Sequence, residues 1–174
     1  RLVTGLKRYS SFAEEVKLGK SNRIDFKVTT GSSSHFIEVK SLQQAHGKGI
    51  GYFPDSKTIR SVSHLDSLIT AQKFGQKITL LIVVQRRDVK IVRLSDVHDL
   101  IFCDRLRAAS KLGLRVRAIL LVPSSRGFIF KGEVPVDLSP YNSQDLVEWK
   151  MAMKPFSGWS RTKADPEARW RRVK

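Results

Sequence analysis

The chain has 174 residues, 41% of them hydrophobic, which is enough for one globular domain with a buried core. It contains 32 Lys and Arg but only 16 Asp and Glu, and the formal net charge of +16 indicates a polyanionic partner. Residues 161–174 hold six basic and two acidic residues, so a net charge of +12 belongs to residues 1–160. Nucleic acid fits this charge better than a membrane surface, because no predicted helix combines a basic face with a strongly apolar one.

The single cysteine, Cys103, excludes a disulfide framework and a cysteine-based metal site. We therefore expect a reducing compartment, either the cytoplasm or an organelle matrix. No apolar run approaches the about 20 residues that a membrane helix needs. The first residue is Arg1 and not methionine, which leaves open a removed targeting segment, a missing upstream domain or a start outside the printed sequence.

The first part of the chain predicts a short helix followed by a strand. A serine at position 10 or 11 followed by two glutamates predicts a helix over 12–17. Apolar and polar residues then alternate over 23–30, with Ile24, Phe26 and Val28 on one side, which predicts a strand.

A second strand is predicted over 35–43, after a connection of one glycine and three serines that favours antiparallel pairing with the first. Its alternation places Glu38 and Lys40 on one face, and Asp25 lies on the preceding strand. Two carboxylates and an ammonium at one point could hold a hard divalent cation and steady a water or a phosphate. Spacing alone favours an ordinary exposed strand face, and the sequence does not fix the register that would bring Asp25 to the other two.

Glycines interrupt residues 43–56, and we predict a long functional loop there, without the spacing of a nucleotide-binding fingerprint. A helix of about 18 residues then begins at position 55 or 56 and ends before Gly75. Arg60 and His64 share its polar side, which is typical of a solvated helix face.

The remainder of the first 138 residues predicts alternating strands and helices. Four strands are predicted, at 78–84, 89–94, 116–122 and 128–130. Between the second and third of them, Ser95 caps a helix that ends before Gly113 and places Cys103 in the core. The order β-β-α-β-α-β predicts an α/β fold with a mixed central sheet flanked by helices.

The C-terminal part has little periodicity beyond a short predicted helix over 144–153. Trp149, Trp159 and Trp170 are interleaved with Lys and Arg. Aromatic residues among basic ones suit stacking on bases and phosphate contacts, but they equally suit docking onto a protein or onto the domain's own surface.

Several separated stretches, each weak alone, occur together in the order found in one family. They are Glu15-Val16-Lys17-Leu18-Gly19, Ser21-Asn22-Arg23-Ile24-Asp25-Phe26, Glu38-Val39-Lys40-Ser41, Phe53-Pro54-Asp55, Thr58-x-Arg60-x-x-x-His64-Leu65 and Val84-Gln85-Arg86. In this combination the chain resembles the sugar fermentation stimulation protein A (SfsA) family. The resemblance covers roughly residues 12–138 and implies DNA binding and a core like that of the PD-(D/E)XK, or restriction-endonuclease-like, nucleases.

The resemblance divides the chain into two predicted domains, and the chain also differs from the usual family pattern. The domains are an SfsA-like nuclease-fold domain at 1–138 and a basic, tryptophan-containing C-terminal extension at 139–174. Family members usually carry a small barrel-like domain before the core, which we expect this chain to lack. The segment from His46 to Ile50 also looks like an addition.

Carried over by position, the resemblance implies a metal-dependent site. Asp25 and Glu38 would be metal ligands, and the backbone carbonyl of Val39 could add a third oxygen. Lys40 would orient the attacking water or offset charge on the phosphate, and Glu15 would lie at the rim as a further acid. Such sites need Mg²⁺ or Mn²⁺, because a phosphodiester requires its oxyanion neutralised and its water deprotonated.

Further positions are implied to contact the nucleic acid. Asp55, Arg60 and His64 match family positions and are expected to line the same cleft, with Arg60 suited to a phosphate. The full set of expected nucleic-acid-binding residues is Arg23, Arg60, His64, Arg86, Arg161, Arg169, Arg171 and Arg172.

Two functions from different classes remain open. The first is a Mg²⁺-dependent nuclease-like enzyme acting on DNA or RNA through Asp25, Glu38 and Lys40. The second is a non-catalytic RNA-binding or structural subunit of a large ribonucleoprotein, such as an organellar ribosome, because a fold can be kept while its chemistry lapses. Nucleic-acid binding is common to both.

Overall fold

The computed structural model describes residues 9–18, 22–46, 48–57, 59–153, 159–160 and 171–172. The chain divides into two compact units, Arg1–Pro140 and Tyr141–Lys174. In the described part of the chain, no helix combines the length and the apolar character required to cross a membrane.

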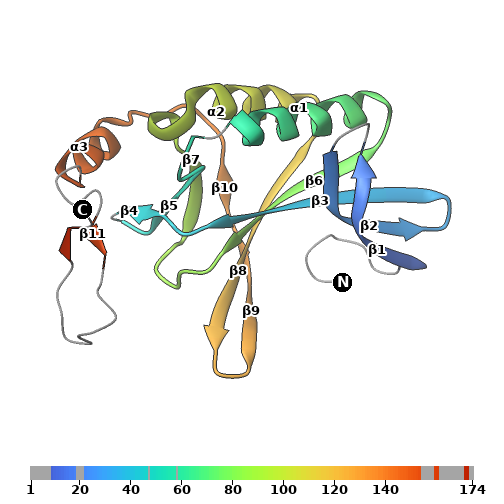
Figure 1. Ribbon diagram of the computed structural model, residues 1–174, viewed down its shortest axis with the longest axis horizontal. Helices are drawn as coiled ribbons and strands as arrows, with labels where there is room; N and C mark the ends of the chain where they lie inside the picture. Colours follow the sequence, from blue (N-terminus) through green and yellow to red (C-terminus); the bar gives the residue numbers. More distant parts are fainter. Residues whose placement is uncertain are drawn as a thin grey trace. The chain divides into compact units, whose positions relative to one another are not determined.

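A six-stranded mixed sheet forms the centre of the first unit (Figure 1). In spatial order its strands are β1 (Ser11–Leu18), β2 (Asn22–Thr30), β3 (Ser33–Leu42), β6 (Lys77–Val84), β8 (Arg115–Ser124) and β9 (Gly127–Val134). The β3–β6 and β6–β8 pairs are parallel, and the other three pairs are antiparallel. The predicted mixed sheet is therefore confirmed, as is the antiparallel pairing of β2 with β3.

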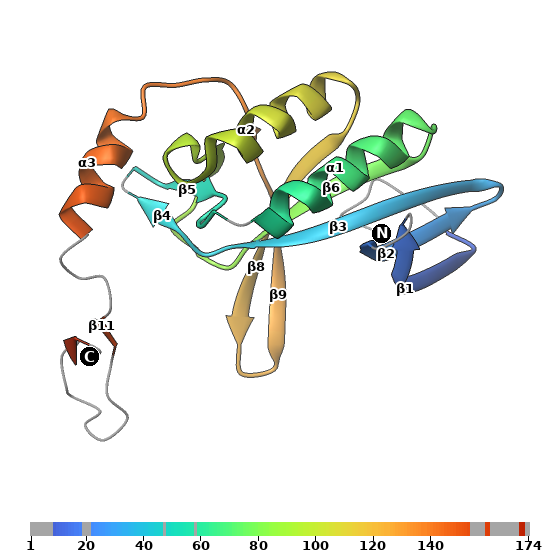
Figure 2. The same ribbon diagram turned by 45° about the horizontal axis from the view of Figure 1, so that its top comes forward.

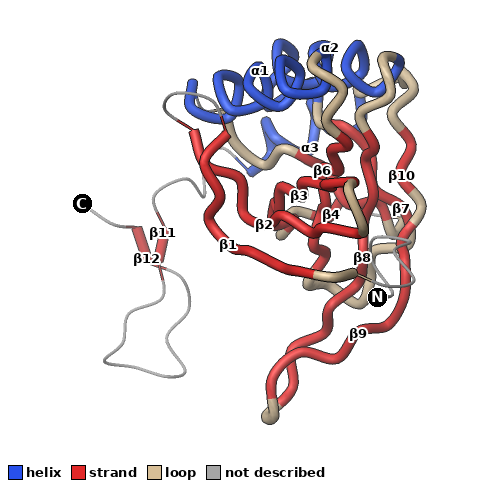
Figure 3. Tube along the Cα trace, turned by 90° about the vertical axis from the view of Figure 1, so that its right-hand side faces the viewer, coloured by secondary structure: helices blue, strands red, loops and turns tan. Residues whose placement is uncertain are grey.

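Helices α1 (Ile59–Lys73) and α2 (Asp96–Lys111) lie side by side over one face of this sheet (Figures 1 and 2). The tube view from the side shows the same layering, with both helices above the strands (Figure 3). Leu65 and Leu68 of α1 and Phe102 and Leu106 of α2 are almost fully buried in one large cluster with the helix-side residues of the sheet. The helical spacing of Leu65 and Leu68 contributed to the prediction of α1, and that of Leu106 contributed to the prediction of α2.

The two faces of β3 and β6 belong to different clusters. On β6, Leu80 and Ile82 join the large cluster beneath the helices, whereas Leu81 and Val83 join a smaller one on the opposite face. This two-sided burial explains why β6 is a continuous apolar run. Glu38 and Lys40 share the alternation of Phe36, so they lie on the helix side of β3.

A second, four-stranded sheet occupies part of the segment that we predicted to be a loop. Its strands, in order, are β10 (Val136–Asp137), β7 (Ile91–Leu94), β5 (Ile50–Phe53) and β4 (Ala45–His46). The loop prediction for 43–56 was wrong because its glycines permit close packing. A Cβ atom on Gly51 would lie 2.9 Å from Val89 and 3.0 Å from Leu42, so only glycine lets β5 approach these side chains.

The predicted helix over 12–17 is also wrong, because these residues form most of β1. The hydroxyl of Ser10, expected to cap a helix, instead donates to the carbonyl of Thr29, and its amide bonds the same oxygen at 2.8 Å. The ring of Phe12 stacks on that of Phe26 with centroids 5.3 Å apart. Pairing with β2 thus overrides a local pattern that favours a helix.

The second unit contains α3 (Gln144–Met153), which confirms the predicted helix, and a short antiparallel pair of β11 (Trp159–Ser160) with β12 (Arg171–Arg172). The side-chain oxygen of Asn142 accepts the amide hydrogen of Gln144 at 3.0 Å, as a helix cap does. The expected nucleic-acid contacts Arg161 and Arg169 lie outside the described residues, as does Trp170.

Helix α2 contains a break that the sequence did not predict. Ser95 precedes the helix, but its hydroxyl pairs with His98 Nδ1 at 2.6 Å and makes no capping bond. Asp99 adopts a non-helical conformation, and its Oδ1 accepts the amide hydrogen of Phe102 at 3.0 Å. Asp99 therefore caps the main part of α2. Cys103 lies one residue past Phe102 and is fully buried, as predicted, and burial raises the pKa of its thiol.

We predict that Asp99→Ala lowers the free energy of unfolding by about 1–2 kcal/mol, because the cap is lost. Asp99→Asn should keep most of the stability, since an amide oxygen can accept the same bond. Urea denaturation followed by circular dichroism measures both. Asp104→Ala is the matched control, because this aspartate is 64% exposed and its ion pair within the described residues is with Arg107 of the same helix. Equal losses for Asp99→Ala and Asp104→Ala would contradict the capping role.

Candidate active site

The pairing of β2 with β3 brings the predicted acidic residues together. The ladder ends at the pair of Phe26 with Ile37, so Asp25 and Glu38 are the next residue of each strand. The regular pairing stops there, and the amide of Val39 donates to Asp25 Oδ2 at 2.6 Å instead of to a backbone carbonyl. This charge-assisted hydrogen bond fixes the carboxylate of Asp25 beside the peptide that links Glu38 to Val39.

Strands β1 and β2 both depart from regular strand geometry near Asp25. Phe26 belongs to the small cluster on the face away from the helices, as Val28 does, whereas Ile24 belongs to the large cluster. The predicted single apolar side of β2 is therefore wrong, since the alternation breaks at Asp25. Opposite the break, Glu15 on β1 has a φ of 49°, a left-handed conformation that is uncommon for a residue other than glycine.

Glu38 is the most deeply buried charged residue of the cluster, at 1% exposure. Its Oε1 lies 2.5 Å from Lys40 Nζ and 3.2 Å from His64 Nδ1 on α1. Burial raises the pKa of Glu38, while the hydrogen bond and charge of Lys40 act in the opposite direction. Among the described residues, neither Glu38 Oε2 nor His64 Nε2 has a hydrogen-bond partner, although both atoms are buried.

His64 faces the interior and not the solvent. Its side chain is only 16% exposed, so the expectation of a solvated helix face is wrong for this residue. The burial of His64 could have been inferred from the sequence, because His64 directly precedes Leu65 and lies one helical turn before Leu68, and both leucines are buried. The side chain of Arg60 lies outside the described part of the structure.

An acidic hollow of about 400 Å³ opens beside Asp25. Glu14, Glu15, Asp25, Phe26 and Val39 line it, so Glu15, which the resemblance implied at the rim of the site, lies next to Asp25. Glu14 was not among the predicted site residues. Antiparallel pairing places Glu14 directly opposite Phe26.

The donor atoms suit a hard divalent cation that keeps part of its water shell. Among the described residues, no group of three or more His, Cys, Asp or Glu side chains could hold a metal ion. Two carboxylates remain, Asp25 and Glu38, and no described residue forms a hydrogen bond with the buried Oε2 of Glu38. Magnesium is commonly held by one or two carboxylates with several waters, so this oxygen set fits such an ion.

Three other predicted residues are not bonded to the acidic residues of this cluster in the described part of the structure. Arg23 is exposed on β2, opposite Lys17 of β1. Arg86 follows β6 and chelates Asp88 through two hydrogen bonds of 2.7 and 3.0 Å, which raise the pKa of the Arg86 guanidinium. Asp55 is exposed, and its recorded side-chain bond is with Ser56 at 3.4 Å. Within the described residues, no hydrogen bond or ion pair joins any of the three to Asp25 or Glu38.

Comparison with known proteins shows which proteins the chain is similar to. Residues 1–127 match the family described as sugar fermentation stimulation protein RE domain. Sugar fermentation stimulation protein homologues from Thioalkalivibrio sulfidiphilus and Chloroflexus aggregans are each 32% identical to the chain over 139 residues. The matches cover 79% and 80% of this chain but only 59% and 53% of those relatives, so the chain spans little more than half of their length.

A solved structure shares the fold. The structure of Pyrococcus furiosus SfsA in complex with Ca²⁺ superimposes with a TM-score of 0.66 at 23% sequence identity. The superposition covers 72% of this chain and 54% of that one. The predicted fold class, a mixed sheet flanked by helices with a nuclease-like core, is thereby confirmed.

The raised pKa of Glu38 predicts how stability depends on pH. Because burial lifts this pKa above its ordinary value of 4.5, the folded protein binds the proton more tightly than the unfolded chain. The stabilisation from this proton is complete below pH 4.5 and is lost as the pH rises through the raised pKa. Glu38→Gln removes the titration, so its stability relative to the natural protein should increase as the pH rises above 4.5 and then level off.

Urea denaturation in EDTA across this pH range measures the difference. Glu14→Gln serves as the control, because it removes an exposed carboxylate from β1, which is separated from the strand of Glu38 by β2. A stability difference for Glu38→Gln that is constant with pH, or that falls as the pH rises, would refute the effect of burial.

Proposed function

The chain belongs to the sugar fermentation stimulation protein (SfsA) family, and we propose that it binds nucleic acid and hydrolyses phosphodiester bonds with a divalent cation. The observation that carries this proposal is the 2.6 Å hydrogen bond from Val39 to Asp25, which holds the Asp25 carboxylate next to Glu38. Two carboxylates on paired strands can supply metal ligands, and a lysine two residues after the second can supply a positive charge for the phosphate.

The charge of the protein supports a polyanionic substrate. The net charge is +16, and exposed basic residues such as Arg23 and Lys17 lie on strands next to the acidic cluster. Basic side chains displace counterions from phosphates, so affinity for nucleic acid should fall steeply as salt increases.

Each side chain of the cluster has a role in this proposal. Asp25 and Glu38, with the carbonyl of Val39, would hold Mg²⁺ or Mn²⁺, which would offset charge on the phosphate and acidify a water when bound. Lys40 is 29% exposed at 2.5 Å from Glu38, so its ammonium can reach a phosphate oxygen while it steadies the carboxylate. His64 limits the movement of Glu38 from the helix side. Water adds its oxygen to phosphorus and releases a proton to solvent, the bond to the leaving oxygen breaks, and that oxygen takes up a proton from solvent.

The Ca²⁺ named for the Pyrococcus furiosus SfsA structure also supports an ion site in this chain. Calcium and magnesium both prefer oxygen ligands, and the cluster offers only oxygen donors at Asp25, Glu38 and Val39. Calcium is therefore a useful probe, since calorimetry can detect its binding without any substrate.

A second candidate is a non-catalytic nucleic-acid-binding protein, including an RNA-binding subunit of a large ribonucleoprotein. It is favoured by the near-complete burial of Glu38, which pairs with Lys40 and His64 and is closed to solvent. The reducing compartment expected from the lone cysteine stays a prediction under either function.

We predict that Asp25→Ala and Glu38→Gln each reduce cleavage of nucleic acid by about 100-fold or more, because each removes a carboxylate needed to place the ion. Labelled single- and double-stranded DNA and RNA, incubated with Mg²⁺ or Mn²⁺, report the rate. Binding to the same oligonucleotides in EDTA should remain close to that of the natural protein.

Asp104→Asn is the control for this experiment, because Asp104 lies on the exposed surface of α2. The absence of metal-dependent cleavage by the pure natural protein, or cleavage that persists in Asp25→Ala, would rule out the enzyme and favour the non-catalytic candidate.

A further inference from the structure

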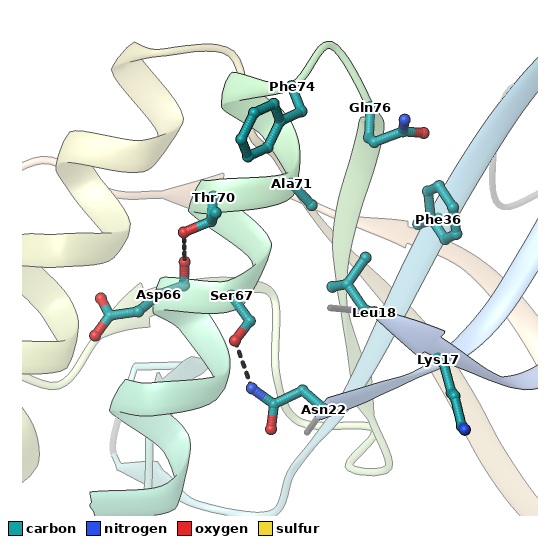
Figure 4. Close-up of a pocket in the computed structure, with 10 residues that line it drawn as sticks. All are labelled: Lys17, Leu18, Asn22, Phe36, Asp66, Ser67, Thr70, Ala71, Phe74 and Gln76. Carbon is teal, nitrogen blue, oxygen red and sulfur yellow. Dashed lines mark hydrogen bonds between the residues drawn. The ribbon is translucent and has the colours of Figure 1, made fainter. Parts of the chain in front are cut away.

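A second hollow, of about 520 Å³, lies between α1 and the ends of β1 and β2 (Figure 4). Its volume falls within the range of about 300–1,000 Å³ that is usual for ligand pockets. Leu18, Phe36 and Ala71 give it an apolar lining, whereas Asn22 and Gln76 add side-chain amides. The acidic hollow beside Asp25 shares none of these residues.

The pocket and the buried acidic cluster both lie along β3 and α1. Phe36 and Glu38 share the helix side of β3 and are two residues apart, which is about 7 Å along a strand. On α1, His64 contacts Glu38, and Ala71 follows two turns later, about 10 Å along the helix. An extended ligand with one group near Glu38 therefore has its neighbouring group within reach of the pocket.

Phe74 is the most exposed large hydrophobic side chain of the pocket. It follows the last turn of α1 and is 79% exposed, the largest exposure among the large hydrophobic residues of the described chain. An aromatic ring that lines a pocket yet stays open to water can stack on a planar ligand, and every nucleobase offers such a face.

The amide of Gln76 can read the edge of a planar base. Asn22 instead donates its Nδ2 hydrogen to the hydroxyl of Ser67, which donates to the carbonyl of Ser63 at 3.2 Å. Ser67 lies seven residues before Phe74, about 10 Å along α1, so Asn22 is out of reach of a base stacked on Phe74. The side chain of Gln76 makes no recorded hydrogen bond within the described residues, and its amide can both donate and accept. Asn and Gln amides pair with base edges in this way.

We propose that this pocket holds one unpaired base of a single-stranded nucleic acid, adjacent to a phosphate that contacts Lys40 next to Glu38. Phe74 stacks on the base, Gln76 bonds its edge, and Lys17 contacts the backbone. The inference rests on the proposed function, because it assumes that the chain binds nucleic acid. It adds that the chain selects an unpaired nucleotide and not an intact duplex at this position.

The test compares two 12-residue oligomers, oligothymidylate and an abasic strand with the same sugar-phosphate backbone. Phe74→Ala should weaken binding of oligothymidylate by about 5- to 150-fold, the usual value of one stacked base, and leave binding of the abasic strand unchanged. The salt dependence should stay the same, because no charge is removed. Fluorescence anisotropy of end-labelled strands in EDTA measures the dissociation constants.

Phe128→Ala is the matched control. This phenylalanine is 60% exposed on the β8–β9 hairpin and lines neither hollow, so its removal should change neither dissociation constant. As a second variant, Gln76→Ala should alter the ranking of oligothymidylate, oligoadenylate and oligocytidylate while binding of the abasic strand is kept.

The outcomes separate this inference from the function on which it rests. Salt-dependent binding of both strands that Phe74→Ala leaves unchanged, or weakens equally, overturns the base pocket and leaves nucleic-acid binding intact. An equal loss in Phe128→Ala likewise overturns it. If the natural protein binds neither strand at low salt, nucleic-acid binding fails and the base pocket fails with it.

Discussion

The burial of the Glu38 carboxylate between β3 and α1 constrains this part of the fold. Removing a charge from water is costly unless other groups compensate, and here Lys40 and His64 converge on one oxygen of the carboxylate. Lys40 comes from the same strand face, and His64 comes from the helix above. The packing of α1 on β3 is therefore set by a polar contact as well as by the apolar contacts of Leu65 and Leu68.

The same point in the sheet couples Glu38 to Asp25 through the backbone. The ladder between β2 and β3 ends at Phe26 and Ile37, and the next amide, that of Val39, is satisfied by the carboxylate of Asp25. A mutation of Asp25 would thus leave a partly buried amide without its acceptor. The carboxylate of Asp25 therefore has two roles, because it ends the strand pairing and is also a candidate ion ligand.

Much of this arrangement follows from periodicity. The two-residue alternation of β3 placed Glu38 and Lys40 on one face, and the continuous apolar run of β6 indicated a strand buried on both sides. The register that brings Asp25 beside them depends on where the β2–β3 ladder ends, which no local pattern encodes. The strand β1 was missed for a related reason, since its two glutamates resemble the first turn of a helix until β2 pairs with them.

The small sheet and the burial of His64 were also not predicted from local sequence patterns. Glycines near β5 read as a loop from the sequence, yet Gly51 is required by side chains of Val89 and Leu42 that come from distant segments. His64 reads as polar and exposed on its own, and its burial follows only from the presence of Glu38 on the facing strand. In both places a tertiary neighbour decides the outcome, and sequence position alone does not reveal that neighbour.

The distribution of charge ties the candidate chemistry to the candidate substrate. The chain is strongly basic, yet Glu14, Glu15, Asp25 and Glu38 gather around a short stretch of β1, β2 and β3, where Lys40 pairs with Glu38. A phosphate drawn to the basic surface would meet repulsion from these carboxylates unless a cation lay between them. A local excess of negative charge in a positive protein is thus the arrangement that makes binding of a polyanion at this point depend on a divalent ion.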